Sequence, residues 1–129
     1  MIKHFFNLAT FLALFMILIG CTENNINNIE SMNIYKMKSF SVTSKNSLRE
    51  INDTKIINIF YEAINNASII SDSTDMVDPQ YKIEIGNDTY FLWLYENSGI
   101  LMNDKDSHTT FSISEKSVKE INSVLANIY

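Results

Sequence analysis

The sequence has little of the residues that most often bend or crosslink small proteins. Among 129 residues there are three Gly, one Pro and one Cys. A single Cys excludes a disulfide framework and every zinc module built on cysteine pairs. So few Gly and Pro exclude a collagen-like chain and a Pro-rich linker. Positive charge is also scarce: Lys and Arg number 10 against 15 Asp and Glu, a net charge of −5. An acidic chain is repelled by phosphate, so we expect no nucleic-acid partner.

Apolar residues, in contrast, are plentiful. Hydrophobic residues make up 46% of the chain and aromatic residues 12%, which rules out a wholly disordered protein. The roughly 109 residues beyond position 20 suffice for one small domain and are too few for two.

Residues 1–20 have the features of a signal peptide. Lys3 provides a positive start, and an uninterrupted apolar run follows from Phe11 to Ile19. Nine helical residues rise only about 14 Å, too little to span a bilayer. This length is typical of the core of a secretory signal.

The end of that run, Leu18-Ile19-Gly20-Cys21, resembles the bacterial lipobox. The resemblance implies that the Cys21 thiol carries diacylglycerol and that the chain is cut before it. The alternative is a buried Cys in an uncleaved hydrophobic anchor. Residues 21–31 hold four Asn, two Glu and no aromatic residue, which indicates a flexible tether. We therefore predict lipid anchoring at the extracytoplasmic face of a cell membrane, with no other cofactor.

Residues 32–129 are predicted to form a single domain. Imperfect alternation over 33–42 indicates a strand, and 43–52 reads as a loop. Asn52 and Asp53 are good helix caps, and apolar residues recur at spacings of three and four from Ile56 to Ala67, which predicts a helix through about residue 68. Ser114 is predicted to cap a last helix whose apolar stripe is Val118, Ile121, Leu125 and Ile128.

The clearest pattern is the alternation over 81–95, which predicts a β-hairpin. A two-residue loop at Asn87-Asp88 places the aliphatic residues on one face. The predicted pairs on that face are Ile85 with Tyr90, Ile83 with Leu92, and Tyr81 with Leu94. On the other face, Glu84 is predicted to pair with Phe91 and Lys82 with Trp93. A second turn at 97–99 would set Tyr95 opposite Ile100 and Trp93 opposite Met102, and a further strand is expected over 108–113.

The resulting order is β-α-β-β-β-β-α. Hairpin-linked strands and grouped helices indicate an α+β fold with a mainly antiparallel sheet of four to five strands and two helices.

The segments DPQYKIEI, YFLWLY and DSHTTFSISEKSVKEI resemble the small YhfM-like lipoproteins of Gram-positive bacteria. The resemblance covers the leader and most of 33–127, and it departs from the family pattern around 71–76. It implies a secreted, lipid-anchored domain of unknown activity and brings no catalytic residues to carry over.

Two acidic stretches are candidate sites. Asp104, Asp106 and His108 form a D-x-D-x-H pattern, and Glu115 follows where a calcium loop has its last ligand. However, Thr109 stands where such a loop needs Gly, so we favour a hairpin turn and expect no tight metal binding. Asp72, Asp75 and Asp78 could act as paired carboxylates of a hydrolase, although such runs are more often solvated loops.

The last candidate is an aromatic face. The predicted pairing gathers Phe91, Trp93, Tyr95, Ile100 and Met102, with Lys82 over the Trp93 indole, on the side of the sheet away from the aliphatic residues. If both helices pack on the aliphatic side, this face is open and suits a protein partner. Otherwise another part of the chain covers it.

Taken together, these features predict a non-enzymatic binding or accessory module with a cell-envelope partner. Two alternatives are an envelope hydrolase that uses the acidic loops and a small-ligand or calcium sensor at 103–108.

Overall fold

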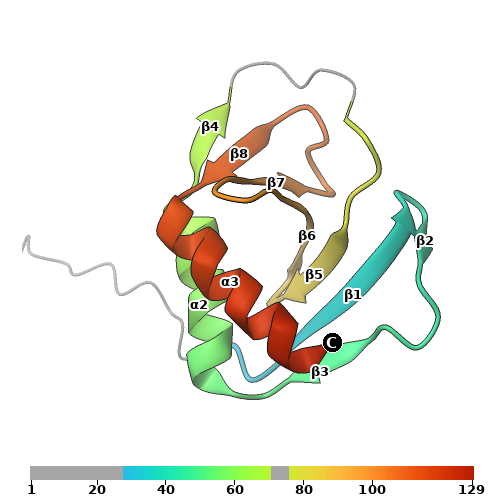
Figure 1. Ribbon diagram of the computed structural model, residues 1–129, viewed down its shortest axis with the longest axis vertical. Helices are drawn as coiled ribbons and strands as arrows, with labels where there is room; N and C mark the ends of the chain where they lie inside the picture. Colours follow the sequence, from blue (N-terminus) through green and yellow to red (C-terminus); the bar gives the residue numbers. More distant parts are fainter. Residues whose placement is uncertain (1–27, 71–75) are drawn as a thin grey trace, which may run out of the picture.

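A computed structural model describes residues 28–70 and 76–129 (Figure 1). The predicted signal peptide, Cys21 and most of the predicted tether lie outside these residues, as do Asp72 and Asp75. Within the described part, no helix is both long enough and apolar enough to cross a membrane.

The described chain forms one sheet and two helices. The strand order is β2-β1-β5-β6-β7-β8-β4, with β3 pairing with β1, and every pairing is antiparallel. This confirms the α+β class with an antiparallel sheet, but the eight strands exceed the four to five predicted. The elements are β1 (Met32–Ser39), β2 (Val42–Thr43), β3 (Arg49–Ile51), α2 (Thr54–Asn65), β4 (Ser68–Ile70), β5 (Tyr81–Ile85), β6 (Asp88–Leu94), β7 (Gly99–Asn103), β8 (Thr110–Ile113) and α3 (Glu115–Ile128).

The additional strands are the short ones at the edges. β2 and β3 lie within or beside 43–52, which was predicted to be a loop, and both pair with β1. β4 begins where the first helix was predicted to end, and it pairs with β8 at the opposite edge. Strands of two or three residues are too short to show an alternating pattern, so their existence depends on the neighbouring strand.

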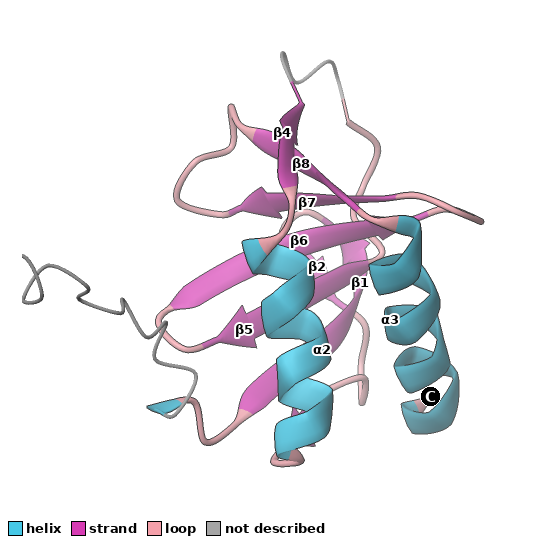
Figure 2. Cartoon of the chain, turned by 90° about the vertical axis from the view of Figure 1, so that its left-hand side faces the viewer, coloured by secondary structure: helices cyan, strands magenta, loops and turns pink. Residues whose placement is uncertain are grey.

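Both helices begin where their caps predict. The Asp53 side chain accepts a hydrogen bond from the Lys55 amide at 2.8 Å, and the Ser114 hydroxyl accepts one from the Ser117 amide at 3.1 Å. These bonds satisfy donors that a helix leaves free in its first turn. Figure 2 shows α2 and α3 side by side on one face of the sheet, which we call the inner face.

The β5–β6 hairpin has a different register from the predicted one. Its loop is Gly86-Asn87, so that Ile85 pairs with Asp88 and Ile83 with Tyr90. Gly86 has φ of 60°, and Gly with positive φ at the first loop position is the mark of a type II′ turn. The shift is two residues, so every side chain keeps its predicted face while its partner changes.

The next hairpin is shifted by the same amount. The turn occupies 95–98, where the Tyr95 amide donates to the Ser98 carbonyl at 2.8 Å. Trp93 consequently pairs with Ile100, and Phe91 with Met102, in place of the predicted Tyr95–Ile100 and Trp93–Met102 pairs. The last strand is also shorter than the predicted 108–113.

The main core lies between the helices and the inner face. Leu92 and Ile83 in the sheet and Val118 in α3 are fully buried. Burying such side chains contributes about 1.5–3 kcal/mol each. All members of this buried cluster lie between Met32 and Leu125, so the described chain from β1 to α3 contains its own core.

Candidate functional site

The predicted aromatic face lies on the side of the sheet away from the helices, which we call the outer face. There Trp93 is only 1% exposed and Met102 5%, whereas Phe91 and Ile100 are partly buried. Tyr95, the first residue after β6, is 50% exposed. The sequence left open whether the aromatic face is exposed or covered. At Trp93 it is covered.

An extended stretch of chain covers Trp93. The indole Nε1 donates to the Val77 carbonyl oxygen at 2.9 Å, and the Gln80 side-chain oxygen accepts from the Leu94 amide at 2.7 Å. From the turn after β1, Phe40 packs its ring 5.8 Å from Trp93 and 5.7 Å from Phe91. The outer face thus has a small second core without a helix.

Lys82 does not lie over Trp93 as predicted. The two-residue shift pairs it with Phe91, and its ammonium group lies 4.2 Å from the centre of the Tyr35 ring. The same group forms an ion pair with Glu84 at 3.1 Å. Lys82 belongs to a polar cluster beside the aromatic one.

The residues of the candidate calcium loop form a turn, as predicted. The Asp106 carboxylate accepts from the His108 amide at 3.2 Å, while Glu115 is paired with Lys119 at 2.7 Å in α3. Within 28–70 and 76–129, no three His, Cys, Asp or Glu side chains are arranged to hold a metal ion. Of the acidic stretch at 72–78, Asp78 is described, and its carboxylate accepts from the Phe40 amide at 3.1 Å.

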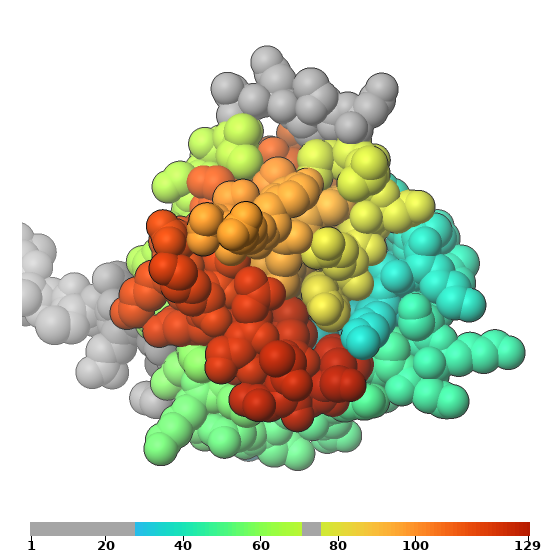
Figure 3. Space-filling model, viewed as in Figure 1, coloured from blue at the N-terminus to red at the C-terminus, as the bar shows by residue number. Residues whose placement is uncertain are grey.

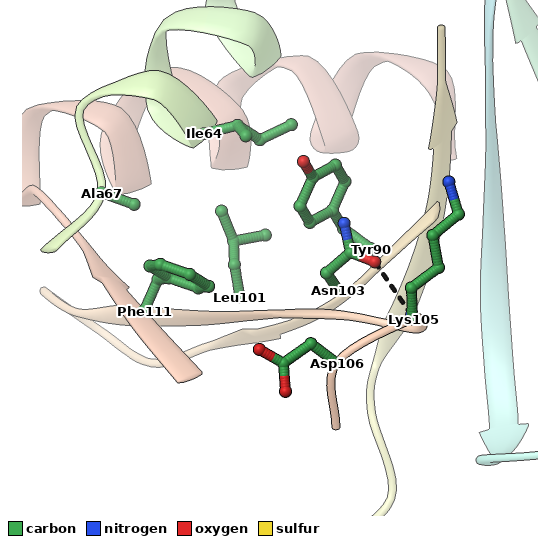
Figure 4. Close-up of a pocket in the computed structure, with 8 residues that line it drawn as sticks. All are labelled: Ile64, Ala67, Tyr90, Leu101, Asn103, Lys105, Asp106 and Phe111. Carbon is green, nitrogen blue, oxygen red and sulfur yellow. Dashed lines mark hydrogen bonds between the residues drawn. The ribbon is translucent and has the colours of Figure 1, made fainter. Parts of the chain in front are cut away.

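A pocket that the sequence did not indicate lies between the end of α2 and strands β6 to β8. It has a volume of about 340 Å³, at the lower end of the roughly 300–1,000 Å³ typical of ligand sites. Figure 4 shows Ile64 and Ala67 facing Leu101 and Phe111 across it. The described residues that line it are Ile64, Ala67, Tyr90, Leu101, Asn103, Lys105, Asp106 and Phe111.

Polar groups lie along one side of this pocket. Lys105 binds Asp88 at 3.0 Å, and this hydrogen bond and charge raise the pKa of the Lys105 ammonium group. The Thr109 side chain donates to Asp106 and lowers the pKa of that carboxyl group. Burial, with the nearby Asp88 charge, raises the pKa of the Tyr90 hydroxyl. The pocket therefore has an apolar body and a rim with both charges, each already engaged.

The pocket adjoins a second one. A cavity of about 330 Å³ shares Ile64 and Tyr90 with the first and extends past Tyr61 to the Gly86 turn and Ile29. The only sequence signal for these pockets was the apolar stripe of α2, which continues to Ala67 beyond the last helical residue. That stripe predicted core packing and did not reveal that the strands opposite leave a gap.

The chain matches known proteins in two comparisons. The family model described as YhfM protein matches residues 25–129. Among solved structures, the crystal structure of a thioesterase-like protein from Clostridium sporogenes is similar, with a TM-score of 0.58 and 13% sequence identity over 74% of this chain and 93% of the other. At that identity the likeness shows a shared fold alone. No curated protein matches significantly.

Proposed function

This chain belongs to the YhfM family, and on that premise we propose that it is a lipid-anchored, non-enzymatic binding module at the extracytoplasmic face of a bacterial membrane. Its anchor is diacylglycerol on Cys21, and its ligand is a cell-envelope component with an apolar body and one polar end. The α2/β6–β8 pocket receives that ligand.

The chemistry of the pocket is the observation that supports binding. Four apolar side chains face one another there, and Tyr90 and Asn103 provide hydroxyl and amide groups at one side. A mostly apolar cavity with a few polar groups at one side is typical of a site that orients a ligand. None of the described residues that line this pocket is a His, Ser or Cys, so they do not include the Ser–His or Cys–His pair of a triad-type nucleophile.

The anchor is tested at Cys21. We expect Cys21→Ser to abolish labelling by a radioactive fatty acid and to leave unprocessed or released protein, because the thiol is the site of acylation. Retention of the fatty-acid label in Cys21→Ser would exclude Cys21 as the lipid anchor.

The pocket is tested by a matched pair of substitutions. We expect calorimetry to detect laurate binding to the wild-type chain, and Ala67→Leu to weaken it about tenfold or more, equivalent to about 1.4 kcal/mol, because the larger side chain fills the pocket. Ala126→Leu adds the same atoms at an exposed position of α3 and should leave the affinity unchanged. Equal affinities in both variants would place laurate elsewhere.

A hydrolase is the second candidate function. Two observations favour it: the thioesterase-like protein shares the fold, and a carboxylate, Asp106, lies at the pocket. The lowered pKa of Asp106 makes it a weak general base at neutral pH. Turnover of a chromogenic acyl thioester by the purified protein, lost in Asp106→Asn with laurate binding retained, would establish the hydrolase and reject the binding module.

A further inference from the structure

Positive charge gathers in one stretch of an otherwise acidic chain. Residues 31–49 contain four basic residues and no acidic one, whereas residues 50–129 contain 13 acidic and five basic residues. Folding places this stretch, from β1 to the start of β3, at one end of the molecule, seen in cyan to blue-green at the right of Figure 3. We call this end the basic tip; its charged residues are Lys36, Lys38, Lys45 and Arg49.

The same stretch exposes large apolar side chains. Phe40 is 37% exposed, and Val42 and Leu48 are each 49% exposed. They lie in the turn after β1, in β2 and just before β3, and the exposed Lys38 and Lys45 are interspersed among them. Apolar side chains among basic ones are the composition by which peripheral proteins bind the headgroup region of a membrane.

The charges of the basic tip are not neutralised by the described chain. None of its four basic side chains forms an ion pair with a described carboxylate. Lys36 and Arg49 lie instead over the Tyr129 ring, at 4.2 Å and 4.8 Å from its centre, a contact that preserves their charge. The Asp78 carboxylate does contact the tip, where it holds the Phe40 amide.

We propose that the basic tip docks on an anionic phospholipid surface, with Phe40, Val42 and Leu48 entering the headgroup region. Charge complementarity selects this occupant, since basic residues near an anionic leaflet are each attracted to it. The domain as a whole is acidic, so a docked tip also fixes its orientation on the membrane.

The chain outside the structure is long enough for this docking. The seven steps from Cys21 to Asn28, where the described chain begins, can extend to about 24 Å, close to the span of about 26 Å of the eight residues of β1. An anchored domain can therefore lay β1 along the membrane and bring the tip down to it. This reach argument rests on the lipid anchor proposed above, while the charge and apolar arguments do not.

The test uses residues 21–129 with Cys21→Ser, which retain the whole core and carry no lipid. We expect sedimentation with vesicles of equal parts phosphatidylglycerol and phosphatidylcholine, weaker at high salt, and none with phosphatidylcholine alone. Lys38→Gln with Lys45→Gln should lower the partition coefficient about 30-fold, roughly a factor of five for each charge. The control, Lys116→Gln with Lys119→Gln in the first half of α3, makes the same change in net charge and should have no effect.

The apolar contact has its own variant. Val42→Ser with Leu48→Ser changes two half-exposed side chains, so the fold should persist while vesicle binding at high salt falls. Unchanged binding in this variant, no binding of the parent chain to phosphatidylglycerol vesicles, or an equal loss in the α3 control would each overturn the proposal. So would dimerisation without vesicles that is lost in the Lys38→Gln, Lys45→Gln variant, since the tip would then bind a second copy. Laurate binding by that variant confirms its fold and keeps this result separate from the pocket.

Discussion

The two faces of the sheet are covered by different kinds of structure. On the inner face, α2 and α3 cover aliphatic side chains such as Leu92 (Figure 2). On the outer face, a non-helical stretch around Val77 and the single ring of Phe40 cover Trp93. Both side chains are almost fully buried, although they are neighbours on one strand and point in opposite directions. A helix that packs on a sheet shows a repeating apolar pattern in its sequence. A short non-helical segment that covers one side chain shows no such pattern.

The largest expected effect comes from the outer face. Trp93→Ala should destabilise the domain by about 3–5 kcal/mol, as removal of a buried aromatic side chain does, and it leaves the Val77 carbonyl without its donor. Trp93→Phe is the control that retains much of the packing and removes only the N–H donor. Urea unfolding measures both; a loss below about 1 kcal/mol for Trp93→Ala would mean that the extended stretch covers the indole without stabilising it.

Leu92→Ala probes the same strand on the inner face. A core truncation of this kind should lower the free energy of unfolding by about 2–5 kcal/mol, a large part of the roughly 5–15 kcal/mol expected for a domain. The folded variant should leave Trp93 as shielded from a fluorescence quencher as before, because the two faces are separated by the sheet. Increased quenching in folded Leu92→Ala would show that the two cores are coupled.

Phe40→Ala should have a moderate effect. The ring is partly exposed and makes two aromatic contacts, each pair contributing about 0.5–1.5 kcal/mol beyond its buried area. Because Trp93 is the only Trp of the chain, acrylamide quenching reports on its cover directly. We expect quenching to rise in this variant; an unchanged value would assign the cover to the stretch around Val77 alone.

The smallest effect is expected from the polar cluster of the outer face. Burial alone would raise the pKa of Glu84, but bonds from Lys82 and Asn33 outweigh it and hold the pKa below its ordinary value. A carboxyl group with a lowered pKa in the folded state contributes stability above its unfolded pKa of about 4.3, and this contribution disappears as pH falls through the folded value. Glu84→Gln should therefore destabilise by no more than about 1 kcal/mol at neutral pH, with the difference from wild type vanishing in acid. A difference that persists in acid urea melts would point to lost packing.

Of the candidate sites, the sequence predicted the chemistry of single residues better than their grouping. The turn at 103–108 is confirmed, because Asp and Asn side chains in turns bind backbone amides two residues on: Asn103 accepts from the Lys105 amide at 2.9 Å. The α2/β6–β8 pocket was not predictable, since Ala67 and Phe111 meet across a gap that no local pattern records.

What the sequence by itself determined was local or periodic. Alternation assigned Leu92 and Trp93 to opposite faces, because successive side chains of a strand point to opposite sides. Ser114 marked the start of the last helix, because its hydroxyl binds an amide only three residues away. Only the tertiary structure decided the register and the cover. Gly86 accepts positive φ, so the hairpin turns one residue earlier than expected and the cross-strand partner of each residue changes by two positions. Trp93 is buried because a chain segment 16 residues away supplies a carbonyl to its indole, a contact that depends on the path of the chain across the finished sheet.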